Sequence, residues 1–99
     1  MVKHIILWKL KEEDAEKKQE ILAGMKKNLE GLVGQVPGLL EVKVITTPLA
    51  SSNADVMLDT TLESEECLKG YQQHPAHVEV ANTYVRPYTE VRMCMDYEI

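Results

Sequence analysis

Alternating apolar and polar residues predict four β-strands along the chain. The segment of residues 2–10 is short enough for a strand and is rich in the branched and aromatic side chains that strands favour. Residues 40–47, 55–62 and 89–99 alternate in the same way. Both faces of the first strand are apolar at its middle, so each side of the sheet should be covered. The face that carries the first histidine consists of Val2, His4, Ile6, Trp8 and Leu10.

A different periodicity predicts helices between these strands. Residues 12–34 carry one apolar stripe at three- and four-residue spacings, with Gly34 as a C-cap before Pro37. Ser64 is typical of an N-cap, and the helix that it opens should stop near residue 73 because Pro75 disfavours helical geometry at His74. We expect a short helix and a loop over residues 75–85. The stripe of the long helix is Ile21, Leu22, Met25, Leu29, Leu32, Val33 and Val36.

The resulting order, βαββαβ, predicts a single α+β domain over residues 1–99 with a ferredoxin-like fold. Both helices should cover one face of a four-stranded antiparallel sheet. The bare face would then expose more apolar surface than a monomer normally shows. A homodimer with the two open sheet faces packed together, a dimeric α+β barrel, would cover it. The residues expected on that face are Ile5, Leu7, Val91, Met93 and Met95.

Charge and cysteine content narrow the function classes. A formal net charge of −5 argues against nucleic acid and against an anionic membrane as partners. No apolar run approaches the ~20 residues of a membrane helix, and we expect no signal peptide. Cys67 and Cys94 match no metal or redox spacing and indicate reduced thiols in a cytoplasmic protein.

The residues best suited to chemistry near neutral pH are His4, His74 and His77, with Tyr71 three residues before the second histidine. His77 could remove a proton alpha to a carbonyl while the Tyr71 phenol stabilises the enolate. Alternatively, both pack under the second helix as a hydrogen-bonded buried pair. His74, which precedes a proline, should cap the next turn, and His4 could be a cavity wall or a core histidine.

Four segments together resemble one known family, the stress-responsive dimeric α/β-barrel domain. They are Val-Lys-His-Ile-Ile-Leu-Trp-Lys-Leu at the start, Val-Pro-Gly-Leu after the long helix, Tyr-Gln-Gln-His-Pro-Ala-His-Val, and Met-Asp-Tyr-Glu near the end. The resemblance implies the ferredoxin-like dimer and an apolar cavity between sheet and helices. In its olivetolic acid cyclase branch a cofactor-free aldol condensation closes a linear polyketide, with groups that correspond here to His77 and Tyr71.

The resemblance also implies which residues surround the ligand. His4 and His74 both have counterparts, whereas Arg92 and Cys94 stand at cavity-facing positions that are aliphatic in that branch, which argues for a different substrate. An inward Arg92 would favour a carboxylate or another anion. The expected cavity-lining or ligand-binding residues are His4, Ile6, Trp8, Leu29, Leu58, Tyr71, His74, His77 and Arg92.

Several alternatives remain open from sequence. Other family members hold a cation on backbone carbonyls that would correspond to Val33, Val36 and Leu39. A side-chain metal site of His74, His77 and Glu79 is disfavoured because a proline separates the histidines, and we expect no cofactor and no metal. The predicted function is that of a small dimeric stress-response-type α/β-barrel protein with a small-molecule cavity, and the alternative is a cofactor-free enzyme of the polyketide cyclase or aldol type. A non-enzymatic stress or binding protein whose cavity is filled by side chains and a cofactor-free monooxygenase are the competing classes.

Overall fold

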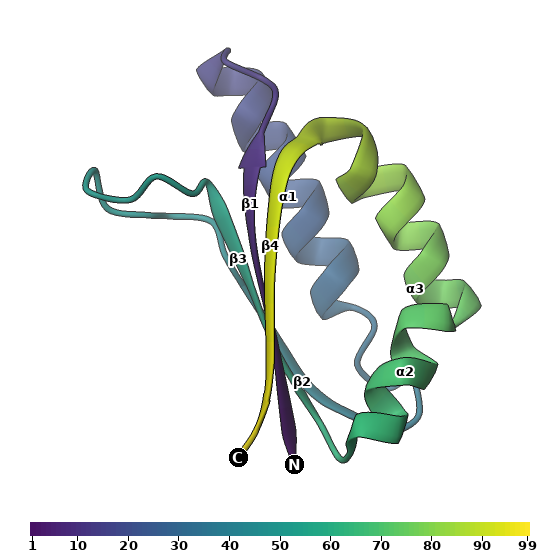
Figure 1. The fold of residues 1–99 in the computed structure, drawn as a ribbon. Helices are drawn as coiled ribbons and strands as arrows, with labels where there is room; N and C mark the ends of the chain where they lie inside the picture. Colours follow the sequence, from purple (N-terminus) through teal and green to yellow (C-terminus); the bar gives the residue numbers. More distant parts are fainter.

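A four-stranded antiparallel sheet in the order β2-β3-β1-β4 carries all helices on one face (Figure 1). The computed structural model describes residues 1–99 throughout. The predicted ferredoxin-like fold and the strand order along the chain are confirmed. The elements are β1 (Val2–Leu10), α1 (Ala15–Glu30), β2 (Leu39–Ile45), β3 (Val56–Leu62), α2 (Glu65–Gln73), α3 (Pro75–Val80), the π-helical turn η1 (Ala81–Val85), the 3-10 turn η2 (Arg86–Tyr88) and β4 (Thr89–Glu98).

The central strand β1 organises the sheet, because it pairs with β3 on one side and β4 on the other. His4 lies opposite Thr60 of β3 and opposite Asp96 of β4. The alternation predicted for β1 and β3 is confirmed, since their inward residues are buried. β4 differs because it is an edge strand, and all its residues after Thr89 are exposed.

Helix α1 is shorter than the predicted span of residues 12–34. Its N-cap is Asp14, whose carboxylate accepts a hydrogen bond from the Lys17 amide, so the preceding acidic residues lie outside the helix. Gly31 caps the other end, and Gly34 (φ 91°) belongs to the following turns. Because the helix stops early, Val33 is 43% exposed and leaves the predicted apolar stripe.

The inward face of β2 also differs from its prediction. A register shift between Leu39 and Glu41 makes Leu39 the buried residue and leaves Leu40 exposed. The sequence places two leucines side by side, and alternation alone cannot tell which of them faces the core. Val42 and Val44 are buried as predicted.

His74 forms the corner between α2 and α3. Its backbone is extended (φ −64°, ψ 133°), as the following proline favours. Its amide bonds to the Tyr71 carbonyl, and its Nδ1 accepts a hydrogen bond from the Ala76 amide, which confirms the predicted capping role. The predicted loop before the last strand is wrong, because helical turns continue from Pro75 to Tyr88.

The sheet face opposite the helices has no cover within the chain (Figure 1). One apolar row crosses all four strands on this face, because Ile45 pairs with Met57, Met57 with Leu7, and Leu7 with Met93. Met93 and Met95 are 68% and 67% exposed. The two termini lie together, with a hydrogen bond from the Ile99 amide to the Met1 carbonyl. No helix in the structure combines the length and apolarity needed to cross a membrane.

Candidate functional site

A cavity of about 100 Å³ lies between the inward face of β1 and the helical segment that follows His74. Seven of the nine residues predicted to surround a ligand line this cavity. Tyr71 and His74 are not among its lining residues, because Tyr71 is fully buried in the core and the His74 ring turns toward the α3 amides. The predicted lining residues that the structure brings together are His4, Ile6, Trp8, Leu29, Leu58, His77 and Arg92.

Five further lining residues were missed from sequence: Gln72, Ala81, Val85, Arg86 and Thr89. Four of them lie in or just after the helical turns that replace the predicted loop. The π-helical turn presents both Ala81 and Val85 to the interior, where they are buried. The wide spacing of a π turn has no distinct signature in a single sequence, although such turns occur frequently at functional sites.

Tyr71 and His77 pack ring against ring, with centroids 4.3 Å apart and planes tilted by 44°. The edge of the Tyr71 ring also meets His4, at a centroid distance of 6.0 Å. The Tyr71 hydroxyl and the His77 Nδ1 are buried without a hydrogen-bond partner. The predicted alternative of a hydrogen-bonded buried pair is therefore wrong, since the Tyr71 hydroxyl has no partner and the two rings meet at a tilt.

Burial shifts both titrating groups toward their neutral forms. It raises the pKa of the Tyr71 phenol, which stays protonated and able to donate a hydrogen bond. Burial is also the main cause that lowers the pKa of His77, and the charges of Arg86 and Arg92 act in the same direction. His77 is therefore neutral at pH 7 and can accept a proton.

The other cavity histidine, His4, has a carboxylate partner. Its Nδ1 donates to Asp96 Oδ1 at 2.5 Å, and the Cys94 Sγ lies 3.8 Å from the same Nδ1. His4 is buried, whereas Asp96 and Cys94 are exposed on the edge strand. With a proton on Nδ1, the His4 Nε2 remains an acceptor.

Both arginines of the chain contribute to the same cavity wall. Arg86 donates a hydrogen bond to Asn82 Oδ1 at 2.5 Å, which holds its guanidinium along the helical segment. Arg92 lies opposite Trp8 in the β1–β4 register and forms no salt bridge in this structure. The cavity wall therefore combines apolar side chains with two guanidinium groups and two imidazoles.

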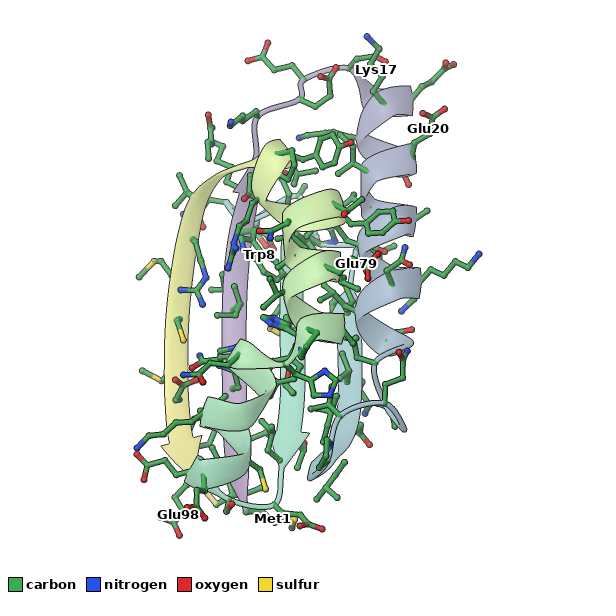
Figure 2. All side chains as sticks on the ribbon, turned by 90° about the vertical axis from the view of Figure 1, so that its right-hand side faces the viewer. Met1, Trp8, Lys17, Glu20, Glu79 and Glu98 are labelled. Carbon is green, nitrogen blue, oxygen red and sulfur yellow. The ribbon has the colours of Figure 1, made fainter.

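A larger hollow, about 440 Å³, lies elsewhere, beside α1. In Figure 2, Lys17 and Glu20 of its wall project from the outer side of α1, whereas Trp8 lies between sheet and helices. It contains no histidine, and most of its wall is exposed. We therefore take the smaller, histidine-lined cavity as the candidate site. The residues that line the groove are Glu12, Lys17, Glu20, Ile21, Gly24, Tyr84 and Tyr88.

The structure does not support the side-chain metal site considered from sequence. His74, His77 and Glu79 do not form a ligand cluster; the structure's single group with ligand spacing is His4, Cys94 and Asp96. Among the three carbonyls suggested for a cation, that of Val36 accepts a hydrogen bond from the Leu39 amide at 3.2 Å. A carbonyl oxygen has two lone pairs, so this bond leaves one for a cation.

Fold and cavity together define a ferredoxin-like domain of the α/β-barrel class. The chain belongs to the stress responsive A/B barrel domain family, whose model matches residues 2–99. It is 31% identical to olivetolic acid cyclase of Cannabis sativa, an alignment that covers 97% of this chain and 94% of the cyclase. The family resemblance seen in the sequence is thus confirmed.

Solved structures agree with the fold and bear on its assembly. A dimeric protein of unknown function from Bacteroides fragilis superposes with a TM-score of 0.91 at 26% identity, over 99% of this chain and 95% of that chain. A dimeric ferredoxin-like protein from Thermobifida fusca, also of unknown function, gives a TM-score of 0.80 at 21% identity, over 99% and 90% of the two chains. The proteins to which this chain is similar thus include a cyclase beside proteins whose function is unknown.

Proposed function

We propose that this protein binds a small carboxylate-bearing molecule in the histidine-lined cavity. The observation that carries this proposal is that both arginines of an acidic chain line one cavity of about 100 Å³. A guanidinium matches the geometry of a carboxylate and can pair with it through two parallel hydrogen bonds. Arg92 has no salt-bridge partner of its own, so its charge is free for a ligand.

The size of the cavity limits the ligand to a compact molecule. Pockets for drug-sized ligands measure about 300–1,000 Å³, so a cavity of about 100 Å³ favours a smaller molecule than a linear polyketide. The wall also favours a less apolar ligand, because it carries Arg86 and Arg92 beside two histidines. A short keto acid satisfies both conditions.

A second function, cofactor-free proton transfer on such a ligand, is supported by the contact between half-buried His77 and buried Tyr71. His77 lines the cavity, and burial keeps its imidazole neutral and able to accept a proton alpha to a carbonyl. The Tyr71 hydroxyl has no partner inside the protein, which leaves it available to stabilise an enolate. Because Tyr71 lies behind the cavity wall, this role requires the ligand to displace part of that wall.

The assembly that we propose is a homodimer formed through the open sheet faces. The apolar row Ile45–Met57–Leu7–Met93 supports it, as do the dimeric relatives. The free thiols of Cys67 and Cys94 support a reducing, cytoplasmic setting.

Thermal denaturation of the full chain with acetate, pyruvate, acetoacetate or acetone tests ligand binding. We expect a saturable rise in Tm with at least one of the acids and none with acetone, which lacks a carboxylate. Arg92→Met should remove the rise, and Lys9→Met, which deletes an exposed cation on the opposite sheet face, should keep it. No rise with any acid, or an equal rise in Arg92→Met, would contradict the proposal.

Deuterium exchange tests the chemistry separately from binding. We expect the protein to accelerate exchange at the methyl group of pyruvate in D₂O, followed by NMR. His77→Gln should reduce that acceleration at least about a hundredfold, the usual contribution of a positioned base. Exchange that is as fast in His77→Gln as in the parent protein would remove this histidine from the mechanism while leaving ligand binding intact.

A further inference from the structure

Three side chains with metal-binding atoms meet at the edge of the sheet beside the cavity. The β1–β4 register places Asp96 opposite His4, and Cys94 lies on the same face two residues earlier. His4 Nδ1, Cys94 Sγ and Asp96 Oδ1 all lie within 4.8 Å of one another. The individual separations are 2.5 Å from Nδ1 to Oδ1, 3.8 Å from Nδ1 to Sγ and 3.4 Å from Sγ to Oδ1.

These separations are near those of a tetrahedral metal centre. Zinc bonds of about 2.0–2.3 Å at tetrahedral angles put N and O about 3.4 Å apart and S about 3.6 Å from each. The two sulfur distances already agree to within a few tenths of an ångström, and only the Nδ1–Oδ1 pair must open. Asp96 and Cys94 are exposed on an edge strand, so their side chains can adjust, whereas buried His4 supplies a fixed ligand.

We propose that His4, Cys94 and Asp96 form a binding site for one thiophilic divalent transition ion, Zn²⁺ or an ion of similar preference, with the fourth position held by water. A thiolate with an imidazole selects such ions against Mg²⁺ and Ca²⁺, which prefer oxygen ligands. Three protein ligands with one open position is the arrangement of zinc sites that act on substrates. The cavity wall at His4 adjoins this position.

Charge and access are compatible with a cation at this point. On binding, the Cys94 thiol releases its proton to solvent, and the His4 proton moves from Nδ1 to Nε2. A thiolate and a carboxylate then neutralise the two charges of the ion. Arg92 lies two residues from Cys94 on the same face of β4. It is the residue of this strand in the cavity wall whose positive charge would repel the ion. The exposed edge gives the ion a direct path from solvent.

Cobalt, used as a spectroscopic probe of the full chain, tests this site. We expect one Co²⁺ per chain, with a thiolate-to-metal absorption band in the near ultraviolet. Cys94→Ser should abolish the band, and Asp96→Asn should weaken binding at least about tenfold, since even supporting residues of metal sites cost that much. Both substitutions lie on the exposed edge strand and leave the core intact.

Matched controls come from the same chain. Cys67→Ser removes the other thiol, and Glu98→Gln removes the next carboxylate on the same face of β4. Both variants should keep the band and the affinity, and an excess of Mg²⁺ should not displace the bound Co²⁺. A parent protein without the band, a band that survives in Cys94→Ser, or unchanged affinity in Asp96→Asn would overturn the assignment.

Discussion

His77 packs on Tyr71 with a ring separation of 4.3 Å, although a helix boundary at His74 divides the two residues in sequence. The corner at His74 brings the first turn of α3 back over the last turn of α2. The imidazole is thereby pressed against an aromatic face on one side and borders the cavity on the other. This contact shapes the acid–base properties of the site.

Burial of His77 predicts a loss of stability in mild acid. The folded-state pKa lies below the unfolded value of about 6.5, so the unfolded chain binds more protons as the pH falls. The part of the free energy of unfolding that depends on His77 is therefore fully present above pH 6.5 and is lost progressively below it. Tyr71 packs on the ring, and His4, Arg86 and Arg92 are the charged or titratable groups that act on it.

Urea denaturation at pH 7.5 and 5.5 measures this effect. We expect the difference in free energy of unfolding between the two pH values to shrink in His77→Gln. His74→Asn is the matched control, because asparagine also caps a helix and the variant likewise lacks one histidine. An unchanged difference in His77→Gln would show that this imidazole does not titrate on unfolding.

Replacing Thr60 with valine should stabilise the fold by about 1 kcal/mol, because the Thr60 hydroxyl is fully buried without a hydrogen-bond partner. Valine has nearly the same shape and removes the unsatisfied polar atom. Thr61→Val, one residue along on the opposite sheet face, should change stability by less than about 0.5 kcal/mol. Chemical denaturation checks both values, and a loss of stability in Thr60→Val would contradict the reasoning.

Gly38→Ala should be strongly destabilising. A comparison with Gly34→Ala separates the two causes, backbone strain and a steric collision. Both glycines have positive φ, at 78° and 91°, which costs an alanine about 1–2 kcal/mol. At Gly38 a new Cβ would also collide with the Cys67 side chain, lying 2.8 Å from its Cβ and closer still to its sulfur, whereas Gly34 faces open space. We expect Gly38→Ala to cost at least about 1 kcal/mol more than Gly34→Ala.

The double variant Gly38→Ala/Cys67→Ala checks the cause of that difference. Removal of the sulfur should recover part of the lost free energy of unfolding, measured as a coupling between the two sites. Strictly additive effects would show that the contact with the Cys67 sulfur is not the source of the cost.

Leu7→Asp should convert the proposed dimer into a folded monomer. Leu7 belongs to the apolar row of the uncovered sheet face, so an aspartate there would lie unpaired within the interface. An unpaired buried charge costs about 3 kcal/mol or more, which weakens association at least about a hundredfold. Light scattering on the variant and its parent checks the mass.

The control for that experiment is Val33→Asp. Val33 is 43% exposed and Leu7 39% exposed, but Val33 lies in the turn after α1 and outside the sheet. The control variant should remain dimeric. A parent protein that is a well-folded monomer would contradict the sheet-packing interface.

Sequence patterning was sufficient for the fold because every strand alternates and the turns carry distinct signals. Ser64 and Pro75 marked the ends of α2 correctly. Errors arose where two residues competed for one position, as at Leu39 and Leu40, and where caps at Asp14 and Gly31 shortened the helix predicted over residues 12–34.

The candidate site was harder to predict, because its polar contacts join distant parts of the chain. His4 and Asp96 are separated by 92 positions, so spacing could not reveal their hydrogen bond, and Cys94 showed no metal signature for the same reason. Arg86 was missed because the segment around it reads as a loop. Arg92 and His77 were found because strand alternation and the family resemblance pointed to them.

The π-helical turn over Ala81–Val85 has a consequence for how this cavity can change. It is closed by a hydrogen bond from the Arg86 amide to the Ala81 carbonyl, one residue wider than an α-helical turn. Deletion of a single residue within this turn would convert it into an α-helical turn and keep the downstream residues in phase, whereas a deletion elsewhere in the segment would rotate them by about 100°. Such a rotation would move Arg86 off the cavity wall while every other side chain kept its identity. The charge of the pocket therefore depends on helical phase, so insertions and deletions can alter ligand preference without any substitution at the wall.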